Sequence, residues 1–119
     1  MDPVEIIDAM YKKGAMLNAK SEELESINES IALAEKSYNI ALSGKMMEFK
    51  VDHGVSICEK LARGDPVVAD LKLSLDKHIV IRDACKRVIS NTLSQIDILR
   101  SDLSYQKEER RSIGSTQPC

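Results

Sequence analysis

Apolar side chains recur every seven residues along the first half of this chain. They form two interleaved rows, one beginning at Met10 and the other at Ile6. The first row is Met10, Leu17, Leu24, Ile31 and Tyr38, and the second is Ile6, Lys13, Lys20, Ile27, Ala34 and Ala41. A stripe with this period lies along one side of a helix, so it predicts a coiled-coil seam rather than the wider apolar face of a globular-domain helix.

A second seam of the same kind runs through the last part of the chain. Its members alternate steps of four and three residues: Leu71, Leu75, His78, Arg82, Cys85, Ile89, Thr92, Ile96, Leu99 and Leu103. No segment has the alternation of a strand. Aromatic residues make up 3% of the chain and Trp is absent. Because globular cores usually draw on aromatic bulk, this composition favours thin aliphatic seams between helices.

Turn-forming residues at positions 53–66 separate the two seams. Gly54 is expected to stop the first helix, and Gly64 to stop a short helix capped by Ser56. Asp65 then caps the last helix, whose first residue is Pro66. The expected elements are helix 3–52, short helix 56–63 and helix 66–109, in a single domain over residues 1–111, followed by a flexible tail at 112–119.

Two long helices joined by about a dozen residues must pack antiparallel, because the connection is too short to return to the far end. We therefore predict an all-α coiled-coil hairpin whose short helix caps the closed end. This helix is expected to lay Ile57 and Leu61 over the end of the first helix. Phe49 is expected near Val68, and Ile31 near residues 85 and 86.

A hairpin seam uses only one stripe of each helix. A fully buried Leu or Ile contributes about 1.5–3 kcal/mol, whereas ordering the backbone of one residue costs about 1–2 kcal/mol. Apolar residues outside the seam therefore need a second surface, and we predict self-association as a homodimer or higher oligomer, most simply a four-helix bundle. The apolar residues left outside are Ile7, Leu33, Leu42, Val80, Ile81, Val88 and Ile98.

Two polar residues, His78 and Arg82, interrupt the second seam one turn apart. In the expected alignment they face Asn39 and Glu35. Polar seam residues commonly fix the alignment of coiled-coil helices. We expect Arg82 to pair with Glu35, and His78 to pair with Asn39 or Glu35. The alternative is that His78 and Arg82 are simply half-exposed.

The bulk composition limits the compartment and the partners. Seventeen basic and 19 acidic residues give a net charge of -2, so no global field attracts polyanions or membranes. No segment reaches the roughly 18 apolar residues of a membrane span, and the first residues lack the pattern of a secretory signal. Three widely spaced cysteines indicate a reducing compartment. We expect a cytoplasmic protein without a membrane partner.

Residue types that carry chemistry are present, but their spacing is not that of a known site. His53, Cys58, His78 and Cys85 are potential zinc ligands, yet they do not form the close pairs of zinc sites. No nucleophile–base set and no phosphate-binding Gly-rich loop is recognisable. We expect no enzymatic activity, no metal and no cofactor.

The joint also supplies the candidate partner contacts, Lys60 and Arg63. Arg63-Gly64-Asp65 spells the integrin-binding tripeptide, but Asp65 is already explained by its position at a helix start.

Nucleic-acid binding is the alternative function. Basic residues are expected at the open end of the hairpin: Lys12, Lys13, Lys107, Arg110 and Arg111. Acidic residues share that end and stacking aromatics are scarce. The preferred interpretation is a non-enzymatic helical protein that acts through protein–protein contacts, and the alternative is a nucleic-acid-binding accessory of replication or recombination.

Residues 33–106 resemble a group of small helical proteins encoded by tailed bacteriophages and prophages. The resemblance lies in Tyr38-x-x-Ala41-Leu42, in Gly54, in Leu61-Ala62-Arg63-Gly64-Asp65-x-x-Val68-Ala69-x-Leu71, and in Leu99-Arg100-Ser101-x-Leu103-Ser104. Such proteins are often encoded near early-region or recombination genes. The resemblance implies a bacteriophage accessory factor that acts on host or phage machinery in the host cytoplasm. It carries over no catalytic or binding residue.

Overall fold

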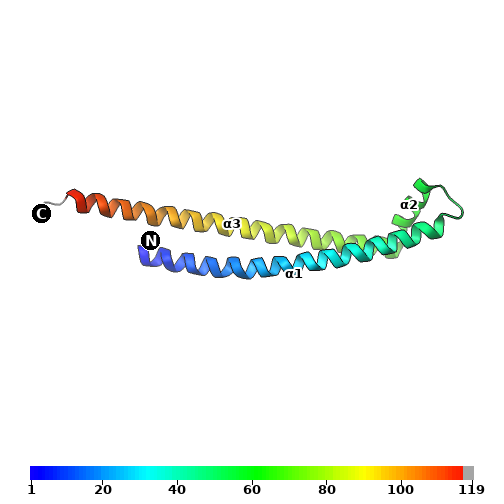
Figure 1. Ribbon diagram of the computed structural model, residues 1–119, viewed down its shortest axis with the longest axis horizontal. Helices are drawn as coiled ribbons and strands as arrows, with labels where there is room; N and C mark the ends of the chain where they lie inside the picture. Colours follow the sequence, from blue (N-terminus) through cyan, green and yellow to red (C-terminus); the bar gives the residue numbers. More distant parts are fainter. Residues whose placement is uncertain (117–119) are drawn as a thin grey trace. The chain divides into compact units, whose positions relative to one another are not determined.

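The computed structural model describes the backbone of residues 1–116 and the side chains of residues 1–112. This part of the chain forms α1 (Pro3–Phe49), α2 (Val55–Gly64) and α3 (Pro66–Thr116), and it contains no strand (Figure 1). The two long helices pack against each other. The prediction of an all-α helical hairpin is therefore confirmed.

Tertiary contacts divide the chain into two compact units. Unit 1 contains the residues up to Glu23 together with the chain from Cys85 onward, and unit 2 contains Leu24–Ala84. The sequence interpretation treats residues 1–111 as one domain. In each unit a part of α1 packs against a part of α3.

The first helix ends earlier than expected. α1 stops at Phe49 rather than at residue 52, because residues 50–52 form a turn in which the N–H of Asp52 donates to the carbonyl of Phe49 at 3.2 Å. Gly54 does not stop α1. It has an ordinary φ of -71° and serves as the N-cap of α2, which begins at Val55, so the expected cap at Ser56 is wrong.

The other helix ends also shift. α2 ends at Gly64 rather than at residue 63. α3 continues to Thr116 rather than stopping at 109. Residues 112–116, expected in a flexible tail, are therefore helical. The rest of that expected tail, 117–119, lies outside the described residues.

The core of unit 2 consists of seam residues from both long helices. Ile31 and Tyr38 of α1 and Val68 and Leu75 of α3 are buried in one cluster. Half-buried apolar residues pack around it: Ile27, Ala34, Ala41, Leu42, Leu71 and Ile79. The predicted seams are thus the surfaces through which the helices of unit 2 meet.

Unit 1 is held by the same kind of seam. Ile6 and Cys85 are buried, as is Thr92, whose hydroxyl donates to the carbonyl of Val88 in its own helix at 2.8 Å. The Cys85 thiol donates to the carbonyl of Lys20 at 3.5 Å. Near the chain start, the side-chain amide of Gln106 donates to the carbonyl of Met1 at 2.9 Å.

The helix alignment in unit 2 differs from the predicted one. Val68 shares its core with Tyr38 instead of lying near Phe49, and Ile31 shares it with Leu75 instead of with residues 85 and 86. The start of α3 is therefore about ten residues further back along α1 than expected. The ten-residue helix α2 is about 15 Å long, at about 1.5 Å per residue. If α2 runs back along α1, its length equals the observed offset.

The direction of α2 explains this offset. Val55 and Cys58, near its start, line a surface hollow with Met46 and Met47 of α1. Near its end, Arg63 donates a hydrogen bond to the Tyr38 hydroxyl at 3.4 Å. α2 therefore runs back along α1 before α3 begins, as the ribbon of unit 2 shows at the joint (Figure 1). The expected short helix at the joint is therefore present, and it covers the end of α1 near Met46 and Met47.

The buried face of α2 is also not the expected one. Cys58 and Ala62 are buried, whereas Ile57 and Leu61 are 52% and 40% exposed. The Cys58 thiol donates to the carbonyl of His53 at 3.5 Å. Small side chains at positions 58 and 62 let α2 lie close to α1, and this replaces the predicted contact through the larger Ile57 and Leu61.

We predict that Gly14→Ala raises the free energy of unfolding by up to about 1 kcal/mol, since glycine is a poor helix former. Gly14 lies inside α1, a Cβ there would meet no atom within 4 Å, and no glycine of the described chain has a positive φ. Urea unfolding followed by circular dichroism measures the change, and Ala15→Gly is the matched reverse substitution. A loss of stability in Gly14→Ala would show that a contact requires the glycine.

Candidate functional site: the joint of unit 2

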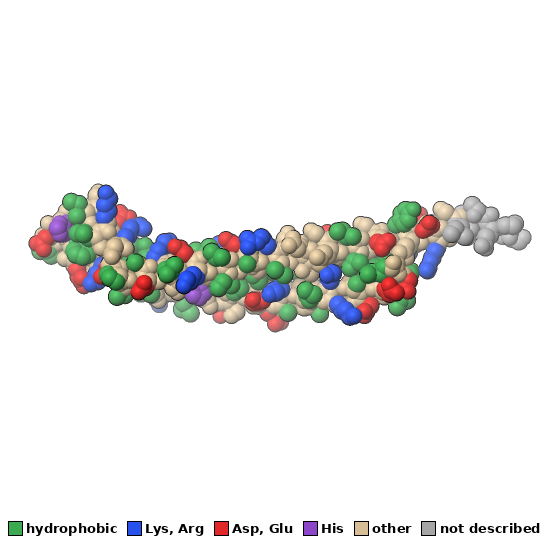
Figure 2. All heavy atoms as spheres, turned by 180° about the vertical axis from the view of Figure 1, so that it is seen from behind, with side chains coloured by type: hydrophobic (Ala, Val, Ile, Leu, Met, Phe, Trp, Pro, Cys, Tyr) green, Lys and Arg blue, Asp and Glu red, His purple; other side chains and the backbone are tan. Residues whose placement is uncertain are grey.

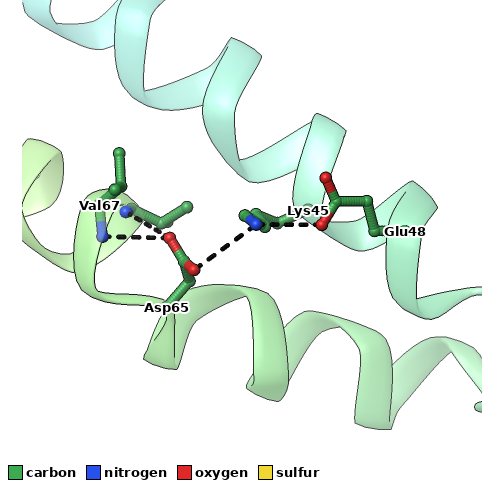
Figure 3. A network of polar contacts seen from close by, with 5 residues as sticks. Lys45, Glu48, Asp65 and Val67 are labelled. Atoms are coloured by element: carbon green, nitrogen blue, oxygen red, sulfur yellow. Dashed lines mark hydrogen bonds and ion pairs between the residues drawn. The ribbon is translucent and has the colours of Figure 1, made fainter.

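Asp65 caps α3, as the sequence predicts. Its Oδ2 accepts hydrogen bonds from the backbone N–H groups of Val67 at 3.1 Å and Val68 at 3.2 Å (Figure 3). These are two of the N–H groups that the first turn of a helix leaves without a partner. Pro66, which has no N–H to satisfy, occupies the first helical position.

The same carboxylate links α3 to α1. Its Oδ1 lies 3.7 Å from the ammonium of Lys45, which also donates to Glu48 at 3.0 Å (Figure 3). The hydrogen bond to Glu48 raises the pKa of Lys45, and the charges of Glu48 and Asp65 act in the same direction. Lys45 therefore remains charged at neutral pH and joins the end of α1 to the start of α3. This link between Lys45 and Asp65 was not predicted from the sequence.

Tyr38 connects all three helices. Its ring is buried in the core of unit 2 and lies 5.5 Å from the ammonium of Lys72 on α3. Its hydroxyl accepts a hydrogen bond from Arg63 of α2, whose guanidinium also binds Glu59 at 2.8 Å. The hydrogen bond to Glu59 raises the pKa of Arg63, with a further contribution from Tyr38.

The two candidate partner contacts differ in their surroundings. Lys60 is exposed on α2. Arg63 is also exposed, but it is bonded to Glu59 and Tyr38 within the joint. The Asp65 side chain is only 18% exposed and both its oxygens have partners. The tripeptide Arg63-Gly64-Asp65 thus serves the joint, as expected. Partner binding through Lys60 and Arg63 stays a prediction.

The three residues predicted to set the helix alignment are not brought together. Arg82 pairs with Asp83 of its own helix at 3.2 Å, and His78 Nδ1 lies 2.7 Å from the carbonyl of Ser74. Glu35 is exposed on α1. The predicted pairs of Arg82 with Glu35 and of His78 with Asn39 or Glu35 are wrong, since the offset of α3 moves these residues apart. His78 and Arg82 are both half-buried, which agrees with the alternative.

The potential metal ligands do not assemble within the part of the chain that the structure describes. No group of three or more His, Cys, Asp or Glu side chains there could hold a metal ion. Cys58 and Cys85 are free and buried, and each thiol donates to a backbone carbonyl.

Two of the five basic residues considered for nucleic-acid binding form ion pairs with acidic residues of their own helices. In unit 1, Lys12 pairs with Asp8 at 3.0 Å and Arg111 with Glu108 at 3.4 Å. On the face shown in Figure 2, basic and acidic side chains are interspersed with hydrophobic ones. Such a surface lacks the continuous positive stripe by which proteins follow a phosphate backbone.

Unit 1 carries an open apolar hollow of about 610 Å³. It is lined by Ile7, Met10, Tyr11, Gly14, Ala15, Leu17 and Asn18 of α1 and by Leu103 of α3. This lining contains no carboxylate, imidazole, thiol or ammonium group. It therefore offers an apolar contact surface rather than acid–base chemistry.

Comparison with known proteins gives no relative: no family model, no curated protein and no solved structure matches this chain. The resemblance to bacteriophage proteins stays a prediction. Within residues 1–116, no helix combines the length and the apolar character needed to cross a membrane.

We predict that Asp65→Ala lowers the free energy of unfolding by about 1 kcal/mol, the usual cost of losing an N-cap. Asp65→Asn is the matched variant, because an Asn side chain still caps a helix but carries no charge for Lys45. Asp65→Asn should therefore retain more stability than Asp65→Ala. Equal losses in urea unfolding would show that the cap contributes nothing beyond the ion pair.

We also predict that the Glu48–Lys45 pair stabilises the fold in a pH-dependent way. The pKa of Lys45 is raised above 10.5 in the folded chain, so its contribution is complete below pH 10.5 and is lost as the pH rises through the folded-state pKa. Urea unfolding should show Glu48→Gln less stable than the unmodified chain at neutral pH. This difference should shrink above pH 10.5. A difference that does not change with pH would contradict the prediction.

Proposed function

We propose that this chain is a non-enzymatic helical interaction protein that acts through protein–protein contacts, beginning with a second copy of itself. One observation carries the proposal: large apolar side chains stay exposed on both long helices of unit 2. On α1, Leu33, Ile40 and Met47 are 67%, 63% and 73% exposed. On α3, the exposed side chains include Leu73, Val80 and Ile81.

The arrangement of these side chains distinguishes them from scattered surface residues. Leu33, Ile40 and Met47 are spaced by seven residues on one helix, so they lie in a row. The exposed face at Leu73, Val80 and Ile81 is a shallow apolar surface on α3. Burying such side chains contributes about 1.5–3 kcal/mol for each one fully removed from water. Exposed large apolar side chains gathered on one face of a helix support an interaction surface.

Polar chemistry in the joint supports a structural role. Asp65 caps a helix, Lys45 links two helices, and Arg63 bonds to Glu59 and Tyr38. These groups are occupied in holding the hairpin together, and the unit 1 hollow has apolar walls. The proposal therefore assigns the chain no catalytic residue and no cofactor.

The proposal also includes the location and the biological context. A cytoplasmic location is supported by the buried free thiols of Cys58 and Cys85, since free thiols persist in reducing compartments. The resemblance of residues 33–106 to tailed-bacteriophage proteins extends the proposal to an accessory factor that binds a host or phage protein.

Analytical ultracentrifugation tests self-association directly. Between about 1 and 100 μM, the range in which an interface of moderate affinity is populated, the average mass should rise from 13.3 kDa toward twice that value. A folded chain that sediments at 13.3 kDa at the highest concentration would overturn the proposal. Circular dichroism of the same samples shows whether the chain is folded.

A further inference from the structure

A second seven-residue repeat runs along α1 in unit 2. Its large members, Leu33, Ile40 and Met47, are exposed. Three small residues at the same spacing alternate with them, beginning just before Leu33: Ser30, Ser37 and Gly44. Successive members are three or four residues apart, so the six residues form one stripe on the helix. We call this stripe the outer seam, to distinguish it from the inner seam that packs against α3.

We propose that two copies of this chain associate by packing their outer seams antiparallel. In such a pair, Leu33 faces Gly44 of the second copy, Ile40 faces its Ser37 and Met47 faces its Ser30. The two-fold axis repeats each contact, so every layer contains one large and one small residue. Alternation of large and small residues across facing positions is what lets helix layers interdigitate, and a two-fold interface must be complementary to itself. The inference rests on the proposed function.

Other pairings fit this stripe less well. A parallel pair would set Leu33 against Leu33 and Gly44 against Gly44 of the second copy, so some layers would be overfilled and others empty. An antiparallel pair shifted by seven residues would leave Leu33 or Met47, at one end of the stripe, without a small outer-seam residue of the second copy to face. The pairing of Leu33 with Gly44 is the one that fills every layer of the outer seam.

Charges beside the outer seam agree with the antiparallel pairing. Glu29 and Lys50 are exposed, and neither makes an ion pair with the described part of its own chain. In the proposed pair, Glu29 lies beside Lys50 of the second copy, at both ends of the contact. Flanking charges of this kind set the orientation of paired helices. In a parallel pair, Glu29 and Lys50 of the two copies would instead lie about 30 Å apart along the helices, from about 1.5 Å per residue.

The proposed interface also accounts for Gly44. This residue lies inside α1, its φ is not positive, and a Cβ there would meet no atom within 4 Å. The fold of the single chain therefore does not require a glycine, although glycine disfavours the helix. A second helix packed closely at this position would require one.

Disulfide trapping tests the pairing of Ser30 with Met47 of the second copy. Ser30→Cys and Met47→Cys are made separately in a chain whose Cys58 is replaced by Ala, because Cys58 lines the same hollow as Met47, and whose Cys119 is replaced by Ser. They are oxidised alone and as an equimolar mixture. Position 30 and its own copy would be about 25 Å apart along the helices, from about 1.5 Å per residue, too far for a disulfide. We expect a covalent dimer in the mixture and almost none in either variant alone. Equal cross-linking of Ser30→Cys alone would overturn the antiparallel pairing.

Added bulk tests the small residues of the outer seam. Ser37→Leu and Gly44→Leu should each weaken the dimer at least tenfold in analytical ultracentrifugation. Asn39→Leu, which adds similar bulk at an exposed position of α1 outside the outer seam, should leave the dimer unchanged. Circular dichroism shows whether each Leu variant is still helical. If one of them is not, oxidation of the mixed Ser30→Cys and Met47→Cys variants decides the pairing.

The outcomes separate this inference from the proposed function. A dimer that resists both Leu substitutions and gives no mixed disulfide would overturn the outer seam as the interface, while self-association would stand. A chain that is monomeric at every concentration would overturn both. A dimer that is weakened by Ser37→Leu and Gly44→Leu, and trapped in the mixture, would support both.

Discussion

The carboxylate of Asp65 determines how the helices of unit 2 meet. One of its oxygens satisfies the first N–H groups of α3, and the other lies 3.7 Å from the Lys45 ammonium of α1. One side chain thus both caps the start of α3 and contacts α1. Because α3 begins directly after this cap, every later residue of its seam in unit 2 has its position along α1 set from this point.

The position of Asp65 depends in turn on α2. This helix can lie along α1 because its buried positions carry Cys58 and Ala62, which are small. Larger side chains there would hold α2 away from α1, and the contact between Arg63 and Tyr38 would be lost. Tyr38 therefore has two structural roles. Its ring packs in the core of unit 2, and its hydroxyl accepts a hydrogen bond from Arg63 near the end of α2.

The sequence was sufficient for the parts of the fold that depend on periodicity. The buried residues Ile31, Tyr38 and Leu75 occupy predicted seam positions, and Asp65 caps α3 where its type and its neighbour Pro66 indicate. The alignment of the helices was not predictable in this way, because shifts of three or four, seven, or ten or eleven residues all keep one seam opposite the other. The choice among these shifts depends on the direction of α2, and the expected pair of Glu35 and Arg82 failed with it. Lys45 carried a usable signal, as a charged residue at a seam position next to the joint.

The outer seam is a consequence of helix geometry that a search for one apolar stripe overlooks. Its residues 30, 33, 37, 40, 44 and 47 each precede an inner-seam position by one residue. One residue turns an α-helix by about 100°, since about 3.6 residues complete a turn. The two seams thus face neighbours at nearly a right angle, which is the arrangement a helix needs to contact two others in a bundle. Within the hairpin, the inner seam of α1 packs against α3. The outer seam remains free for a second copy. When the outer seam of that copy runs in the opposite direction, each small residue of one seam faces a large residue of the other.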